Sequence, residues 1–128
     1  MLTFELMDEE YSICRLSGVD EVPGWAAGPF VSVTRTPDEL SIVCPALGVP
    51  GGIHQERGWR CFRIAGPLDL SLVGILASVT SALAAADVNV FAIGTYDTDY
   101  LLVKESLLEQ ATQALQNAGH DIRRRTSF

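Results

Sequence analysis

The sequence predicts an α+β fold in which antiparallel sheets carry helices on one face. Of the 128 residues, 48% are hydrophobic and 20% are charged, so the chain can bury a core and extended disorder is excluded. The N-terminal part shows the alternation and turns of strands, whereas the C-terminal part combines strand patterns with two helix patterns. We therefore predict two small halves, residues 1–58 and 59–128, of which the first has reduced helices.

The first two strands are expected to form a hairpin. Leu2–Met7 and Tyr11–Leu16 alternate loosely between apolar and polar residues, and the acidic residues Asp8–Glu10 lie between them. Ser17–Gly28 follows as a loop, because its three glycines and its proline allow at most a short helix around Trp25–Ala27.

Two further strands, Phe30–Arg35 and Leu40–Cys44, flank the turn Thr36–Glu39. Pro37 fixes the backbone φ that the second position of such a turn requires. The same four residues would also suit the start of a helix. We reject this alternative because the next segment is rich in β-branched residues and stops at Pro45.

The second half follows a glycine-rich loop, Ala46–Gly58, and begins with the strand Trp59–Ile64. The turn Gly66–Asp69 then leads into a helix predicted over Leu70–Ala86. Its core-facing residues recur at helical spacing: Leu72, Ile75, Leu76, Val79 and Leu83. The opposite face carries no charge, which indicates a second contact surface. Its small residues are Ser71, Ser78, Ser81, Ala82 and Ala85.

The strands Val88–Thr95 and Tyr100–Lys104 follow, joined by Tyr96–Asp99. This region weakly repeats the first half at an offset of 61 residues. The matched residues are Phe30, Thr34, Asp38 and Leu40 with Phe91, Thr95, Asp99 and Leu101. Together with the shared order of strand, turn and strand, the repeat indicates two halves of related topology.

A last helix is predicted with Ser106 as its cap, Glu109 completing the capping box and Gly119 just beyond its end. The strand His120–Arg124 completes a βαββαβ order from Trp59 onward. This is the ferredoxin-like arrangement, which places two helices on one face of an antiparallel sheet.

The net charge of −7 disfavours nucleic acid or an anionic membrane surface as a partner. The basic run Arg123–Arg125 is interpreted as a solvated strand end. Met1–Glu10 lacks the basic region of a secretory signal, so we expect a cytoplasmic protein. The uncharged stretch that begins at Leu70 is shorter than the roughly 20 residues of a membrane span.

The chain offers little catalytic chemistry. Known nucleophile, phosphate-binding and metalloprotease motifs are absent from the sequence. Cys14, Cys44 and Cys61 are expected to be buried, and His54 and His120 to be structural. Cys44, His54 and Cys61 form the only conceivable metal set, but a fourth ligand is missing. We therefore expect neither a metal nor a cofactor.

Asp97 and Asp99 stand out as a carboxylate pair between two strands. They are interpreted either as parts of a solvated turn or, for Asp99, as the acceptor of a ligand ammonium group. The start of the helix after Gly66–Asp69 has unpaired N–H groups, which attract a carboxylate. Together the two features would suit a zwitterionic amino acid, unless Asp69 itself caps the helix.

Three segments resemble a known family: Ile93–Glu105, the preceding Leu83–Val88, and Thr34–Val43 in the first half. They are similar to ACT domains, and specifically to the tandem ACT-like proteins that include the cytosolic arginine sensors of animals. The resemblance extends over nearly the whole chain.

The resemblance implies a regulatory module that binds amino acids between paired ACT domains and performs no catalysis. Carried over by position, the ligand contacts fall on Leu72, Val73, Gly74, Ile75, Thr95, Tyr96, Thr98 and Asp99, with Asn89 and Val90 supplied by the facing domain. The arginine sensors carry an acidic residue where this chain has Leu72. An apolar or small ligand side chain is therefore expected, unless Asp69 substitutes for that acid.

We thus expect a homodimer that binds an amino acid and is not an enzyme. The first alternative is a protein interaction module without a ligand. The second is a small enzyme that uses Cys44 or Cys61.

Overall fold

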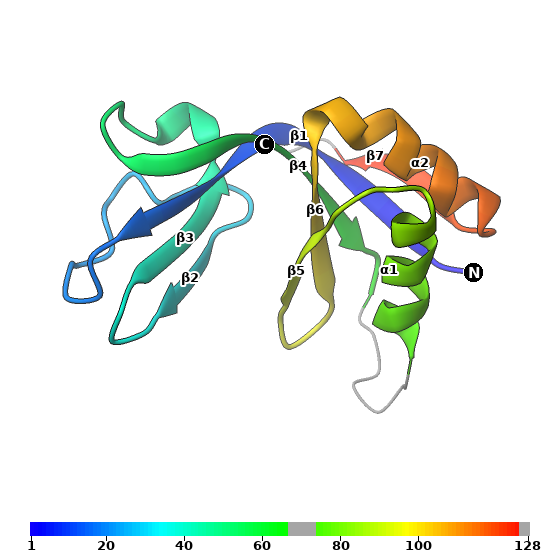
Figure 1. Ribbon diagram of the computed structural model, residues 1–128, viewed down its shortest axis with the longest axis horizontal. Coiled ribbons are helices and arrows are strands. Elements are labelled where there is room, and N and C mark those ends of the chain that lie inside the picture. Colours follow the sequence, from blue (N-terminus) through cyan, green and yellow to red (C-terminus); the bar gives the residue numbers. More distant parts are fainter. Residues whose placement is uncertain (67–73, 126–128) are drawn as a thin grey trace. The chain divides into compact units, whose positions relative to one another are not determined.

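The computed structural model describes residues 1–66 and 74–125, which fold into two compact units (Figure 1). Unit 1 contains Met1–Asp8 and the described residues from Arg60 onward, and unit 2 contains Glu9–Trp59. The boundary that the sequence predicts after residue 58 is close to this division, which falls between Trp59 and Arg60. The first eight residues, however, fall in the unit of the C-terminal residues.

The elements follow the order of the chain. The strands are β1 (Thr3–Leu16), β2 (Ser32–Arg35), β3 (Leu40–Pro45), β4 (His54–Ile64), β5 (Phe91–Gly94), β6 (Asp99–Lys104) and β7 (Asp121–Arg125). The helices are α1 (Ile75–Ala85) and α2 (Leu108–Asn117), with short 3-10 turns at Ala46–Gly48 and Glu105–Leu107. Since β1 and β4 cross the division, each contributes strand residues to both units.

Unit 1 contains the predicted βαββαβ order as β4, α1, β5, β6, α2 and β7. Its strands lie in the spatial order β7-β1-β4-β6-β5. β1 therefore separates β4 from β7, and it pairs with β7 in parallel, with Thr3 opposite Asp121. The N-terminal residues thus supply a central strand to the sheet that the sequence assigned to the second half alone.

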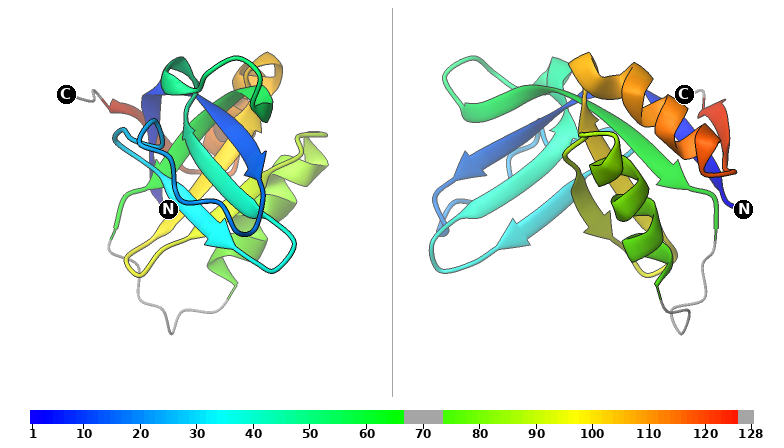
Figure 2. Two further views of the ribbon diagram at one scale, coloured as in Figure 1. Left: turned by 90° about the vertical axis from the view of Figure 1, so that its left-hand side faces the viewer. Right: turned by 45° about the vertical axis from the view of Figure 1, so that its right-hand side comes forward.

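Both helices of unit 1 cover the same face of its sheet (Figures 1 and 2). Apolar residues of the strands and helices form one core between the two layers. Its buried members are Phe4, Leu6, Phe62, Ile64, Val79, Leu83, Val88, Leu101, Val103, Ala111 and Leu115. Val79 and Leu83 belong to the predicted stripe of α1, and their burial confirms which face of that helix points inward.

Unit 2 is a sheet in the order β2-β3-β1-β4. Between its described residues the only helical segment is the short turn Ala46–Gly48. Cys14, Leu40, Ile42, Cys44 and Val49 form its buried core. The segment around Trp25, where the sequence allowed a short helix, is a turn.

The hairpin predicted at Asp8–Glu10 is wrong, because β1 runs through these residues as one strand of 14 residues. Three acids in a row imitate a turn, but two of their carboxylates have distant partners. Asp8 pairs with Arg124 at 3.1 Å, and Glu10 accepts the N–H of Gly58 at 2.8 Å. The loop predicted over Ala46–Gly58 is also shorter than expected, since β4 begins at His54.

The predicted end of the last helix is confirmed, whereas its predicted cap residue is wrong. Gly119 has a φ of +92° directly after α2, and the N–H of His120 bonds to the carbonyl of Leu115, as in a Schellman motif. Ser106, however, does not cap α2. It lies in a 3-10 turn, and Leu107 occupies the cap position without a side-chain hydrogen bond.

The β2–β3 and β5–β6 turns share a hydrogen-bond pattern. The N–H of Thr36 bonds to the carbonyl of Glu39 at 2.9 Å, and that of Thr95 bonds to the carbonyl of Thr98 at 2.8 Å. In both turns the threonine hydroxyl also accepts an N–H from the last turn residue. The turns therefore correspond at an offset of 59 residues, from Thr36 to Thr95, and not at the 61 of the sequence repeat.

Candidate functional site

Four of the predicted ligand residues lie together in the β5–β6 turn. The hydroxyl of Thr95 donates to the carbonyl of Thr98 at 2.9 Å, so it stabilises the turn itself. The hydroxyl of Thr98 is buried and donates to the carbonyl of Ile64 at 2.7 Å, which ties the turn to the end of β4. Both hydroxyls thus donate their protons to the backbone and can offer a ligand only their acceptor positions.

Asp99 contributes the one carboxylate among these four predicted ligand residues. It begins β6 opposite Gly94, and a Cβ built on Gly94 would lie 3.2 Å from its Oδ1. Within the described residues its half-buried carboxylate makes no hydrogen bond or ion pair. Tyr96, at the tip of the turn, is 86% exposed. The turn therefore presents two carboxylates, the half-buried one of Asp99 and the exposed one of Asp97, and one exposed aromatic side chain.

The start of α1 lies at the same end of unit 1 as this turn (Figures 1 and 2). Gly74 occupies the cap position with a φ of +85°, and within residues 1–66 and 74–125 no side chain caps the helix. The first N–H groups of a helix have no intrahelical acceptors, and the first turn of α1 contains no acidic residue that could accept from them. These groups and the positive end of the helix dipole favour a carboxylate.

The remaining predicted residues lie elsewhere or outside the described part. Asp69, Leu72 and Val73 fall in residues 67–73, which the structure does not describe. Asn89 and Val90 follow the opposite end of α1, whose 11 residues span about 16 Å. One copy of the chain therefore does not bring Asn89 and Val90 to the β5–β6 turn, and their assignment to a facing domain stays a prediction.

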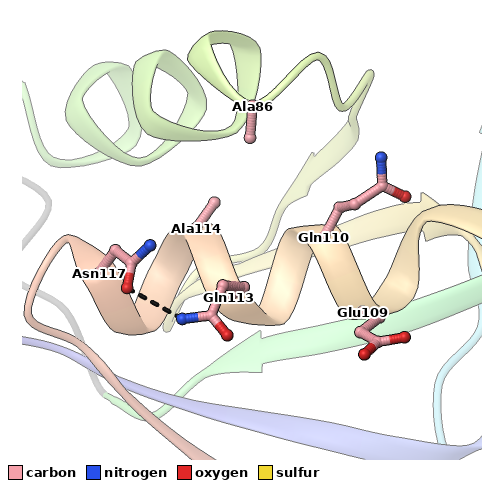
Figure 3. A pocket seen from close by; sticks show the side chains of 6 residues that line it. All are labelled: Ala86, Glu109, Gln110, Gln113, Ala114 and Asn117. Carbon is pink, nitrogen blue, oxygen red and sulfur yellow. Dashed lines mark hydrogen bonds between the residues drawn. The ribbon is translucent and has the colours of Figure 1, made fainter.

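Two of the hollows that the described residues form were not predicted from the sequence, because each is built from distant segments. In unit 1, a pocket of about 410 Å³ lies between the last turn of α1 and one side of α2 (Figure 3). It is lined by Ala86, Glu109, Gln110, Gln113, Ala114 and Asn117, and Gln113 donates to Asn117 at 2.9 Å. None of the predicted ligand residues lines it. The second hollow lies in unit 2.

The cysteines are buried, as predicted. Burial raises the pKa of the Cys44 thiol to about 11, and it also raises the pKa of Cys14. Since the thiolate is the reactive form, this environment disfavours Cys44 as a nucleophile. Across residues 1–66 and 74–125, no three metal-ligating side chains gather in one place. In the same residues, no helix has the length and apolar character to cross a bilayer.

Two family models match the chain. Residues 55–117 match an ACT domain, and residues 9–52 match a model described as the N-terminal domain of a family. Together they follow the division of the described chain into two units.

The human cytosolic arginine sensor for mTORC1, subunit 1, is a curated relative. It is 39% identical over 59 residues, which cover 45% of this chain and 18% of the sensor. The match thus spans less than a fifth of that relative.

Solved structures extend the likeness to the whole fold. A protein from Agrobacterium tumefaciens has a TM-score of 0.90 and 39% identity, covering 97% of this chain and 93% of its own. The ligand-free regulatory subunit of aspartate kinase from Thermus thermophilus has a TM-score of 0.60 and 14% identity, covering 87% and 93%. The first is a relative along its length, and the second shares the fold. From its matched residues and its architecture, the chain belongs to the ACT-domain family.

Proposed function

We propose that the protein is a regulatory module that binds an amino acid at an interface between ACT domains of two copies. The observation that carries this proposal is the pair of complementary groups at one end of unit 1. Within the described residues, the carboxylate of Asp99 is unbonded and no side chain caps the start of α1. An α-ammonium group at Asp99 and an α-carboxylate at the helix start would satisfy both.

The relatives support the same class of function. One is a sensor of arginine, and another is the regulatory subunit of an enzyme of amino-acid metabolism. Neither name describes a catalytic subunit, which supports a module without catalysis. The relative's cytosolic name supports a cytoplasmic location. We also interpret unit 2 as an ACT-like half, a proposal that the equivalent turns at Thr36 and Thr95 support.

Two surfaces of unit 1 support pairing with a second copy. The exposed positions of α1 are small and uncharged: Ala77, Ser78, Ser81, Ala84 and Ala85. β5 is an edge strand and contains no charged residue or proline that would block pairing with another strand. A dimer formed through unit 1 would place Asn89 of one copy next to the second copy. The prediction that a facing domain supplies Asn89 requires such an arrangement.

Calorimetric titration with each of the twenty amino acids tests this function. We expect at least one to bind to the wild type, and Asp99→Asn to weaken its binding about 10- to 100-fold, because hydrogen bonds to charged groups contribute roughly 1.5 to 3 kcal/mol. Asp97→Asn, at an exposed position of the same turn, is the matched control and should bind like the wild type. Equal losses at both positions would contradict the assignment of Asp99. No binding by any amino acid, with a stable dimer, would favour the interaction module without a ligand.

A further inference from the structure

The second hollow, a pocket of about 490 Å³, lies entirely within unit 2. Its walls are mainly apolar and come from the loop before β2 and from the 3-10 turn after β3. They include Ala27, Pro29, Pro45 and Leu47. None of the residues proposed to bind an amino acid in unit 1 lines it.

The apolar walls are held in place by backbone contacts. Gly28 lies so close to Pro45 that a Cβ on Gly28 would come within 2.5 Å of the proline Cγ. Ala46 is 1% exposed, which anchors the 3-10 turn, whereas Leu47 in the same turn is 98% exposed. Leu47 is among the residues that line the pocket, and its side chain is almost fully exposed to solvent.

Two oppositely charged side chains, Arg57 and Glu10, complete the lining of the pocket. Their hydrogen-bond partners among the described residues are backbone groups. Arg57 donates from Nη1 to the carbonyl of Ala46 at 2.9 Å and from Nη2 to that of Val49 at 2.8 Å. These bonds fix the guanidinium group and leave three of its five N–H donors. Glu10 accepts the N–H of Gly58 on Oε2 at 2.8 Å, which leaves Oε1. Glu10 and Arg57 both line the pocket, and Gly58, which donates to Glu10, follows Arg57 in β4.

We propose that this pocket binds a small zwitterion with an apolar side chain, such as an apolar α-amino acid. The ammonium group lies at Glu10, the carboxylate lies at Arg57, and the side chain contacts the apolar walls beside Leu47. Glu9 adds a second carboxylate to the lining.

A series of three probes with the same branched apolar body tests the proposal. Leucine carries both charges, 3-methylbutylamine only the cation and 4-methylpentanoate only the anion. Each is titrated into the ¹⁵N-labelled protein, and amide shifts are followed by NMR. We expect leucine to shift the amides of Ala27, Gly28 and Gly48 with the highest affinity, and each probe with a single charge to shift them with lower affinity.

Variants identify the charged and apolar contacts. Glu10→Gln keeps an acceptor for Gly58 and removes the charge, so leucine should bind about 10- to 100-fold more weakly. Leu47→Ser should also weaken binding without changing the melting temperature, because the side chain is exposed. Glu21→Gln, at an exposed position away from the pocket, is the matched control and should bind like the wild type.

The outcomes separate this site from the one in unit 1. Asp99→Asn should leave the unit 2 shifts unchanged. Leucine shifts confined to Thr95–Asp99 would overturn the unit 2 site while supporting the unit 1 site. Equal binding of leucine and 4-methylpentanoate, or no shift at the pocket, would also overturn it.

Discussion

At the end of α1, Asp87 adopts a left-handed backbone conformation with a φ of +62°. The N–H groups of Asp87 and Val88 bond to the carbonyls of Ala84 and Leu83, so the residue occupies the position that glycine usually takes in a Schellman motif. Its carboxylate also lies at the negative end of the helix dipole. The conformation and the charge of Asp87 both oppose stability.

We therefore expect Asp87→Gly to increase the free energy of unfolding by about 0.5 to 1 kcal/mol. Removal of the strain and of the charge outweighs the greater backbone entropy of glycine in the unfolded chain. Urea unfolding measures the change. Asp87→Asn, which removes the charge and tolerates the same φ, should give a smaller gain. A loss of stability in the glycine variant would contradict this account.

His120 joins the two strands that begin and end the described chain. Its Nδ1 accepts the N–H of Leu2 at 3.0 Å, and its ring packs edge-on against Phe4. Burial lowers the pKa of His120 below its ordinary value of 6.5, and the nearby α-ammonium group of Met1 lowers it further. A protonated Nδ1 cannot accept the Leu2 N–H, so the fold requires the neutral ring.

This lowered pKa gives His120 a defined effect on stability. Below pH 6.5 the unfolded chain takes up the proton before the folded chain does, so the His120 contribution is complete above pH 6.5 and is lost as the pH falls through the folded pKa. Urea unfolding from pH 7.5 to 5 should show this decline in the wild type. His120→Gln should lack that component of the slope. Identical slopes in the two proteins would exclude His120 as its source.

At the level of elements, the local patterns identify most of the fold. The β2–β3 turn, α2 with its terminal Gly119, and the inward stripe of α1 could all be read from neighbouring residues, because short-range spacing determines them. The continuity of β1 through Asp8–Glu10 could not, since it depends on Arg124 and Gly58, which are distant in sequence.

The candidate site also has features that local sequence predicts and features that it does not. The sequence places Thr95, Tyr96, Thr98 and Asp99 in one turn, and the structure keeps them there. The hydrogen bond from the Thr98 hydroxyl to the carbonyl of Ile64 could not be predicted from the sequence, because it joins residues 34 positions apart. The unit 2 pocket was missed because four separate segments build it.

The uncharged face of α1 is the element on which the proposed dimer depends. Ser78 is exposed and lies on this face, so Ser78→Glu should leave the folded monomer intact. At a dimer contact it would bury an unpaired carboxylate, which commonly costs about 3 to 5 kcal/mol. Sedimentation velocity should show a dimer for the wild type and a monomer for the variant.

Gln116→Glu adds the same charge at an exposed position of α2 and is the matched control. It should sediment like the wild type. A wild type that is monomeric at micromolar concentration would contradict the proposed interface.

For the whole molecule, the position of β1 between β4 and β7 determines which pieces can fold. A fragment of residues 60–128 lacks this central strand, and its β4 and β7 cannot pair across the gap. We expect the fragment to be unfolded by circular dichroism. The Nη2 of Arg60 donates to the carbonyl of Met7 at 2.9 Å, so the two ends of unit 1 at its boundary are close.

Replacing residues 9–59 by a short Asn-Gly turn should therefore restore a folded unit 1, because this dipeptide favours tight connections between neighbouring strands. Cooperative thermal unfolding and a dispersed NMR spectrum would show that this shortened chain is folded. A folded 60–128 fragment, or an unfolded chain with the turn, would contradict the role assigned to β1.

The inserted strand also sets the order of events during synthesis. Of the described elements, β1 is synthesised first, and β7, the parallel partner of its N-terminal residues, is synthesised last. Chains grow at about 5 to 20 residues per second, so unit 2 can be complete about 3 to 13 s before β7 exists. During that interval the apolar side chains of Leu2, Phe4 and Leu6 have no finished sheet to enter. Nascent chains shorter than about 125 residues should therefore be more exposed to chaperones and to aggregation than the released protein.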